Sequence, residues 1–470
     1  MASFLSDAVL LGDASQKRRV RRALRAGIRV YAIGGSITAS FGGCFGEGCD
    51  RRISHQPRKS EPSQLKDSGF LSMFMRELNH SWPNPRHALF NRGIGGSGAG
   101  LLLSGCLSAF VPDDADLVLI DYAVNMDAHS AARVHQELLA AFAAYPNPPA
   151  VAVLLNFFWC RNADGSDARW RTGDQRASVK ETHEACMTGD GPAKLRQAAA
   201  LHIQHIRAVA QIATHCGAAS LSMFDELAPR IAIGELAVAS ISQDGFHPWR
   251  KRRASLEQAV LVRSWAQLLS RWLGRIATPS AYDGAAHTLH TEAAVPFTWR
   301  ADGTARVGAE DRGRGKCRRS GRNVINHCYG AYDYFPSLSI LDLGGWTFEE
   351  SVPAHLRAKL NATAWSLKPG WVSVEAGQVL KLRVVERGRL TLQMEFLHSY
   401  ENAGVVSFHC TGGCGCPQQR PHPTRWSKLM SGGGAIRLKV DSSNASECVL
   451  HIRHHAEPRV KFTALTVQVE

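Results

Sequence analysis

The chain has 470 residues, long enough for two or three domains with full-sized hydrophobic cores. Apolar residues make up 44% of it and charged residues only 20%, proportions that exclude a disordered chain. The longest apolar run, residues 150–160, is too short to cross a bilayer, so no transmembrane segment is expected. The net charge of +14 and the pI near 9.4 favour acidic partners, such as anionic polysaccharide, nucleic acid or a membrane surface, without choosing among them.

Residues 1–26 form a basic N-terminal segment. Such runs occur in nuclear-localisation and nucleic-acid-binding segments. The alternative is the solvated face of a helix, because Val20 and Leu24 lie four residues apart. The apolar start precedes the basic cluster, the reverse of a secretory signal peptide, so none is predicted. The cluster comprises Lys17, Arg18, Arg19, Arg21, Arg22 and Arg25.

A strand and a sharp turn follow. Residues 28–33 are an apolar, β-favouring run with the length of a buried strand, and Gly34-Gly35-Ser36-Ile37-Thr38 comes next. Glycines let the chain leave a strand abruptly, and a serine placed there lies at the carboxyl edge of the sheet, where open α/β sheets bind ligands. An ordinary turn is the alternative interpretation of these residues alone.

Over the next 240 or so residues, stretches with helical spacing of apolar residues alternate with short apolar runs. Helical spacing predicts helices, and short apolar runs predict strands between them. Such alternation implies parallel βαβ units and a doubly wound sheet. The predicted helices are 70–78, 98–110, 131–144, 194–216 and 255–273, and the predicted strands are 88–90, 116–125, 150–157 and 219–224.

Three later stretches belong with the Gly-Gly-Ser-Ile-Thr turn. They are Asn-Arg-Gly-Ile-Gly-Gly at 91–96, the strand at 116–125 that ends on Asn125, and Asp-Gly-Phe-His-Pro at 244–248. In order and spacing the four resemble the sequence blocks of the SGNH/GDSL hydrolase superfamily, an esterase and acyl-transfer fold. The resemblance covers roughly residues 27–273. It implies a flavodoxin-like, three-layer α/β domain over residues 27–275.

Carried over position by position, the resemblance implies that Ser36 is the nucleophile and that His247 takes its proton. Asp244 would orient the imidazole, and the oxyanion hole would consist of the Ser36 and Gly96 N–H groups and the Asn125 amide. The chemistry agrees, because a serine needs an adjacent base, histidine is neutral near pH 7, and a carboxylate fixes its tautomer. No metal or organic cofactor is required.

One departure concerns the third block, which usually reads Gly-x-Asn-Asp. Here it is Ala-Val-Asn-Met at 123–126, so Met126 replaces the acid. The missing carboxylate is expected to leave the active-site loop less firmly tied down. Asp225, after the strand at 219–224, is a second acid candidate behind Asp244.

Four other side chains have two interpretations each. His183 and Glu184, in the polar segment 160–191, are either substrate contacts or solvated loop residues. His202 and His205 lie three apart on a predicted helix and could bind a metal. No carboxylate or cysteine partner lies nearby, so surface or helix-packing histidines are the stronger interpretation.

Residues 41–68, which follow the turn directly, are expected to rim the pocket. Cys44 and Cys49 there are spaced for a small disulfide loop, with free thiols as the alternative. Residues 276–329 have linker composition, Gly-rich and basic. The arginines of this segment and Lys316 either bind an anionic ligand or are solvated.

Residues 330–470 change character. Seven alternating runs separated by turn residues predict an antiparallel β-sandwich or jelly roll. The region looks like the accessory β-domain that follows SGNH domains in some algal and plant-like proteins, and such a module could bind carbohydrate. Four tryptophans are either sugar platforms or core residues: Trp346, Trp365, Trp371 and Trp426.

The cysteines in the stretch 409–416 stand four and two residues apart, which does not match paired Cys-x-x-Cys zinc knuckles. A disulfide to Cys448 or a group of free thiols is favoured over zinc. Twelve cysteines, with sequons at Asn79, Asn361 and Asn444, lean toward the secretory route.

Two classes of function follow. The first is a serine esterase that removes acyl groups from a carbohydrate or small ester through an acyl-enzyme on Ser36, and anionic substrates are included. Its variant transfers the acyl group to a sugar hydroxyl. The second is a catalytically degenerate protein that binds carbohydrate or another anionic ligand. Neither class includes a nucleic-acid partner, and the sequence predicts no oligomeric state.

Overall fold

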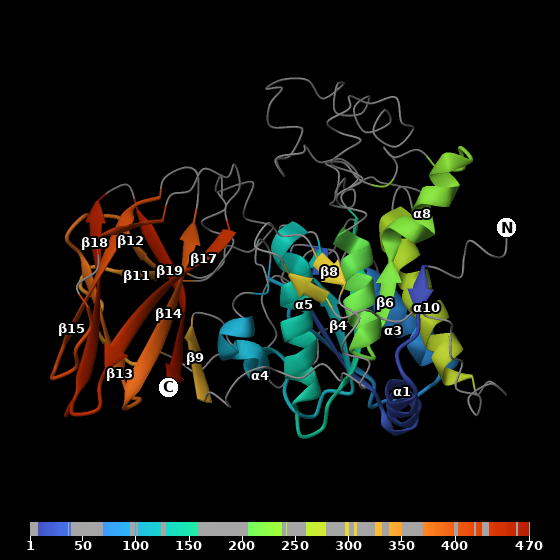
Figure 1. Cartoon of the computed structure of the whole chain (residues 1–470), viewed down its shortest axis with the longest axis horizontal. Helices are drawn as coiled ribbons and strands as arrows, with labels where there is room; N and C mark the ends of the chain where they lie inside the picture. The colour runs from blue at the N-terminus through green and yellow to red at the C-terminus, as the bar shows by residue number, and fades with distance from the viewer. Residues whose placement is uncertain are drawn as a thin grey trace. The chain divides into compact units, whose positions relative to one another are not determined.

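The fold was analysed in a computed structural model of the chain (Figure 1). It describes residues 8–35, 37–38, 69–94, 99, 102–123, 128–157, 205–236, 241, 260–278, 297–299, 305–307, 325–330, 338–349, 370–398, 403–417, 420–424, 432–456 and 459–469. The chain divides into two compact units, one of residues 1–48, 64–90 and 113–320, the other of residues 49–63, 91–112 and 321–470.

The first unit is built on a six-stranded sheet with the order β1-β6-β5-β4-β2-β3. Strands β2, β4, β5 and β6 are parallel, and β1 is antiparallel to β6 at the edge. Strands β4 and β5 are buried along their whole length, which explains the continuous apolar runs 117–120 and 150–155. The strands are β1 (Val9–Leu10), β2 (Arg29–Gly34), β3 (Ala88–Asn91), β4 (Leu117–Asp121), β5 (Ala150–Leu155) and β6 (Ala219–Ser222).

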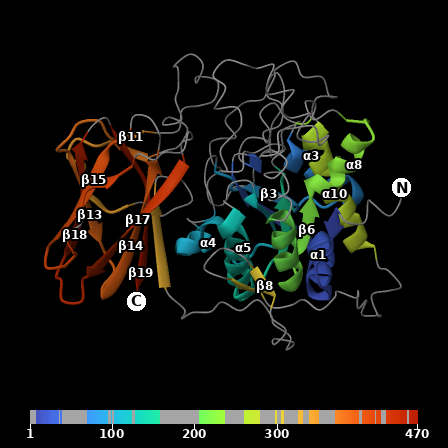
Figure 2. The same ribbon diagram turned by 45° about the horizontal axis from the view of Figure 1, so that its top comes forward.

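Helices cover both faces of this sheet. Helices α1, α3 and α10 pack together on one face, while α5 lies on the other (Figures 1 and 2). The doubly wound, three-layer fold expected from the sequence is therefore confirmed. The helices are α1 (Ala14–Ala26), α3 (Phe70–Ser81), α5 (Ala128–Ala143), α8 (Met223–Ala232) and α10 (Val260–Ala277), and residues 205–215 are also helical.

The basic N-terminal cluster lies on α1. Asp13 caps the helix by accepting a hydrogen bond from the Gln16 N–H at 2.9 Å, and Val20 and Leu24 are buried. The helix ends at Gly27, whose φ of 103° favours glycine. The helix-face interpretation of the basic run is confirmed, since its arginines and lysine lie on the exposed and half-buried sides of a packed helix.

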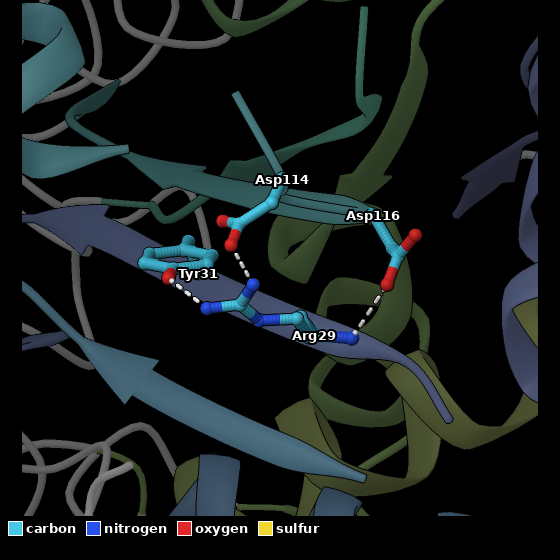
Figure 3. A network of polar contacts seen from close by, with 4 residues as sticks. All are labelled: Arg29, Tyr31, Asp114 and Asp116. Carbon is cyan, nitrogen blue, oxygen red and sulfur yellow. Dashed lines mark hydrogen bonds and ion pairs between the residues drawn. The ribbon is translucent and has the colours of Figure 1, made fainter. Parts of the chain in front are cut away.

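The amino ends of β2 and β4 are joined by a polar network (Figure 3). The Arg29 N–H donates to Asp116 Oδ2 at 2.9 Å, and its guanidinium pairs with Asp114 and donates to the Tyr31 hydroxyl at 3.3 Å. The Tyr31 ring stacks on Phe90 with centroids 4.4 Å apart. These contacts fix the register of the two strands at one end, and so align their opposite ends.

Replacing Arg29 by methionine is expected to lower the free energy of unfolding by about 1 kcal/mol, because the guanidinium is partly exposed and its ion pair is screened. Urea unfolding followed by circular dichroism measures the loss. Arg133→Met is the matched control, since Arg133 is 66% exposed and only 3.9 Å from Glu137. Equal effects of the two substitutions would contradict a structural role for the Arg29 network.

Helix α5 carries a histidine that is fully buried. His135 Nδ1 donates to the Ala131 carbonyl oxygen at 2.7 Å, and among the described residues Nε2 has no hydrogen-bond partner. Burial lowers the pKa of His135 to about 4. Because the unfolded chain binds a proton here below pH 6.5 and the folded chain does not until about pH 4, this group stabilises the fold above pH 6.5 and loses that contribution as the pH falls.

We expect His135→Leu to remove this part of the acid sensitivity. Between pH 6.5 and 4 the wild-type free energy of unfolding should fall by as much as about 3 kcal/mol more than that of the variant. Urea denaturation at the two pH values measures the difference, with the exposed His80→Gln as control. If the two variants keep the same pH dependence, His135 is not held neutral in the folded chain.

The second unit is a β-sandwich. A five-stranded sheet, β10-β13-β18-β15-β16, and a six-stranded sheet, β11-β12-β19-β14-β17 with β9 beside β19, enclose one apolar core. All the pairs in both sheets are antiparallel, as the sequence predicts. The strands are β9 (Ile325–Gly330), β10 (Ile340–Asp342), β11 (Thr347–Glu349), β12 (Gly370–Ser373), β13 (Val379–Val384), β14 (Arg389–His398), β15 (Val405–Thr411), β16 (His422–Pro423), β17 (Gly432–Asp441), β18 (Cys448–Ala456) and β19 (Val460–Val469).

The sugar-platform interpretation is wrong for two of the four tryptophans. Trp346 and Trp371 are only 1% and 7% exposed and belong to the core of the sandwich. Trp371 packs against Phe348 and Phe462. Trp365 and Trp426 lie outside the described residues.

Disulfides hold the second unit together. Cys414 pairs with Cys448, and Cys410 with Cys416, which confirms the disulfide interpretation of the 409–416 stretch. A third bond joins Cys106 to Cys328 on β9. Residues 102–110, expected within one helix, are a π-helical turn (Leu102–Cys106) followed by α4 (Leu107–Phe110), and they group with the sandwich. Cys44 and Cys49 lie outside the described residues.

Two features fall inside the expected linker. Strand β9 extends the sandwich back to residue 325, and a two-stranded ribbon is formed by β7 (Phe297–Trp299) and β8 (Ala305–Val307). None of the helices in the described part of the chain combines the length and apolar composition that a membrane crossing needs.

Candidate active site

The strand order of the sheet makes the carboxyl ends of β2 and β4 a candidate ligand site. From β2 the chain goes to β3 on one side, and from β4 it goes to β5 on the other. Open α/β sheets bind ligands at the carboxyl ends of strands where the order reverses in this way. The last register pair of β2 and β4 is Gly34 with Asp121, so these residues mark the edge.

The turn after β2 is tightly constrained. A Cβ atom on Gly34 would lie 2.4 Å from Thr38 Oγ1 and 2.7 Å from the Asp121 carbonyl oxygen, so a larger residue would not fit. The Gly35 N–H donates to that same carbonyl at 3.1 Å. Ile37 and Thr38 are helical and buried. The residues on either side of position 36 therefore show the strand and sharp turn expected from the sequence, followed by the start of a helix.

A buried series of side-chain hydrogen bonds holds this turn. Thr38 Oγ1 lies 2.7 Å from Asp121 Oδ2, and Asn156 Nδ2 donates to Asp121 Oδ1 at 2.5 Å. Trp265 Nε1 on α10 donates to Asn156 Oδ1 at 2.7 Å. All four side chains are at most 1% exposed. This series of hydrogen bonds connects the ends of β2, β4 and β5 to α10.

Burial raises the pKa of Asp121 to about 6, although the hydrogen bonds from Thr38 and Asn156 act to lower it. The folded chain thus keeps a proton that the unfolded chain releases near pH 3.8. This group favours the folded state at low pH, and the contribution is lost as the pH rises through 6. Its effect on stability opposes that of His135 over the same range.

The second block begins at the end of β3, next to β2 in the sheet. Asn91 is 8% exposed, and its Oδ1 accepts from the Gly93 N–H at 3.0 Å, which turns the chain out of the strand. The described residues continue to Ile94. Blocks one, two and three thus leave the ends of three neighbouring strands.

The predicted catalytic and oxyanion-hole residues themselves lie outside the described residues. They are Ser36, Gly96, Asn125, Asp244 and His247, and Met126, His183, Glu184 and His202 lie outside as well. Their roles stay predictions.

The structure does place the second acid candidate. Asp225 lies in the first turn of α8, where its N–H donates to Ser222 Oγ at 3.2 Å. Strand β6, which precedes it, is three strand spacings from β2, about 14 Å. An acid in the first turn stabilises a helix, so this position favours a structural role for Asp225.

The structure describes one member of the histidine pair, His205, and His202 lies outside the described residues. His205 is only 5% exposed, which agrees with a helix-packing residue. Within the part of the chain that the structure describes, no three His, Cys, Asp or Glu side chains come close enough to hold a metal ion.

Sequence reasoning missed Asp121 and Asn156. The available signal was a single polar residue ending an otherwise apolar strand in each case, Asp121 after Leu117–Ile120 and Asn156 after β5. A buried charge is costly unless hydrogen-bonded, so such a residue marks a position with a specific partner.

Comparison with known proteins supports the two-part fold. No protein-family model matches the sequence, and no curated protein matches it. A two-domain esterase (CEX) active on acetylated mannans, co-crystallised with mannopentaose, aligns over 98% of this chain and 96% of its own, with 14% identity and a TM-score of 0.50. The acetylxylan esterase Axe2 from Geobacillus stearothermophilus aligns over 52% of this chain and 96% of its own, with 14% identity and a TM-score of 0.34.

Proposed function

We propose that the chain is a serine ester hydrolase that removes acyl groups, such as acetyl, from a carbohydrate or small ester through an acyl-enzyme on Ser36. The observation that carries the proposal is the Gly-Gly-Ser-Ile-Thr turn at the point where the strand order reverses. Hydrogen bonds from Gly35 and Thr38 to Asp121 fix the residues on both sides of Ser36 at this edge.

In the proposed reaction the Ser36 hydroxyl attacks the acyl carbonyl carbon as His247 takes its proton. The oxyanion accepts hydrogen bonds from the Ser36 and Gly96 N–H groups and the Asn125 amide. Collapse expels the alcohol, which His247 protonates, and a water molecule then releases the acid by the reverse sequence. Asp244 orients the imidazole and stabilises its charged form.

Two observations support a polysaccharide ester as substrate. A solved structure that aligns with 98% of this chain is that of an esterase active on acetylated mannans. The net charge of +14 would also attract a polymer that carries acidic sugars. Within this proposal, residues 27–275 supply the catalytic domain and residues 330–470 an accessory domain.

The family resemblance keeps two other outcomes open. If a sugar hydroxyl replaces water in the second half of the reaction, the same acyl-enzyme makes the protein an O-acyltransferase. Because Met126 replaces the acid of the third block, loss of catalysis would leave a carbohydrate-binding protein.

The test is hydrolysis of p-nitrophenyl acetate and of acetylated mannan by the wild type and by Ser36→Ala. Release of free acetate by the wild type alone supports the hydrolase. Transfer of acetyl to an added oligosaccharide supports the transferase, and equal rates for the two proteins would contradict both.

A further inference from the structure

The turn 34–38, which carries the proposed nucleophile and is called the nucleophile turn below, is held by hydrogen bonds whose direction is largely fixed. An indole N–H can only donate, so Trp265 requires the oxygen of the Asn156 amide to face it. The Asn156 NH₂ group must then face Asp121, and Asp121 Oδ1 must accept. The direction of every bond as far as Asp121 is thus set by a tryptophan on α10.

This leaves Asp121 Oδ2 as the one oxygen of the carboxylate whose role depends on its proton. When Asp121 is ionised, Oδ2 accepts and the Thr38 hydroxyl donates at 2.7 Å. When Oδ2 is protonated, it donates and the Thr38 oxygen accepts. The Asp121 backbone carbonyl meanwhile accepts from the Gly35 N–H in both states.

We propose that Asp121 is the positioning residue of the nucleophile turn, holding Gly35 with its carbonyl and Thr38 with its carboxylate so that Ser36 between them is presented at the sheet edge. The inference rests on the proposed function of Ser36. In this proposal Asp121 acts through the turn, by its bonds to Gly35 and Thr38. A displacement of about 1 Å at a reacting group costs up to about 100-fold in rate, so loosening this turn should be visible in kcat.

Among the residues that the structure describes, burial and hydrogen bonds alone act on the pKa of Asp121, and no other charge does. Strand β5 carries none, and the nearest on β2 are Tyr31 and Arg29, three and five residues before Gly34. The group that reaches it from α10 is Trp265, through Asn156. With a pKa of about 6, the Asp121 carboxyl group changes its protonation state as the solution becomes mildly acidic.

Four variants test the proposal in the full-length chain. Asp121→Asn mimics the protonated acid, because its amide can donate to Thr38 while its oxygen accepts from Asn156. Asp121→Ala removes the side-chain hydrogen bonds to Thr38 and to Asn156. Thr38→Val removes the hydroxyl at nearly constant volume, and Thr38→Ser restores it.

With p-nitrophenyl acetate we expect Asp121→Ala and Thr38→Val to lower kcat by about 10- to 100-fold with little change in KM. Thr38→Ser should recover most of the loss. Protonation of Asp121 reverses the donor and acceptor roles in its bond to Thr38, so in the wild type kcat/KM should fall on acidification with two protonations, one at the catalytic base and one at Asp121. Asp121→Asn should show only the first. Circular dichroism at each pH establishes that the variants are folded.

Two results would overturn the inference. One is wild-type kcat in folded Thr38→Val and Asp121→Ala while Ser36→Ala is inactive, and the other is an unchanged two-proton limb in Asp121→Asn. If Ser36→Ala itself retains the wild-type rate, the proposed function fails first, so the two failures are distinguishable.

Discussion

Ser36→Ala is expected to lower kcat for p-nitrophenyl acetate by at least about 10⁴-fold with KM nearly unchanged. Removing the nucleophile eliminates the acyl-enzyme route and leaves only the contribution of the oxyanion donors and of binding. Steady-state rates of nitrophenolate release measure the loss. Rapid mixing of the wild type should also show a burst of one nitrophenolate per chain if deacylation is the slower step.

Ser40→Ala is the matched control for this experiment, because it removes a hydroxyl from the same stretch of sequence four residues further on. Its kcat should stay within about twofold of the wild type. A comparable loss in both variants would show that the substitutions disturb the segment in general and would not identify Ser36 as the nucleophile.

Replacing Cys106 and Cys328 together by serine is expected to produce the largest loss of stability in the second unit. The bond closes a loop of 222 residues, and in the chain-entropy view a loop of that length stabilises by about 5 kcal/mol. Cys106 is fully buried and lies 3.2 Å from Thr466 Oγ1, so the substitution also disturbs a packed contact. Urea unfolding of the oxidised protein measures the change in free energy.

The disulfide Cys410–Cys416 provides the comparison, because its sequence separation is only 6. On the same entropic argument its removal should cost about 2 kcal/mol. Equal losses for the two bonds would mean that local packing, and not loop length, determines what each contributes.

Strands with unbroken apolar sequence were predictable because burial on both faces leaves no other pattern. This holds for β5 and for the apolar runs 30–33 of β2 and 117–120 of β4. The tight turn after β2 was predictable from its glycines, and the structure gives the reason, the close approach of Gly34 to Thr38 and Asp121.

Other features depend on partners that local patterns do not reveal. Strand β9 has the sequence Ile-Asn-His-Cys-Tyr-Gly, which lacks a long apolar run, and its place in the sheet is set by pairing with β19 some 140 residues later. The bond from Asp121 to Thr38 spans 83 residues. Spacing within a block indicates the chemistry of a residue, but only the fold shows which distant side chain supports it.

The disulfide between Cys106 and Cys328 also sets an order of events during synthesis. A ribosome delivers the chain from the amino end, so the thiol at position 106 must wait for 222 more residues before its partner exists. During that interval the Cys106 thiol can form a disulfide with a cysteine other than Cys328. Oxidative folding of this protein should therefore be sensitive to how fast translation proceeds and to whether an isomerase is at hand to correct early mispairing.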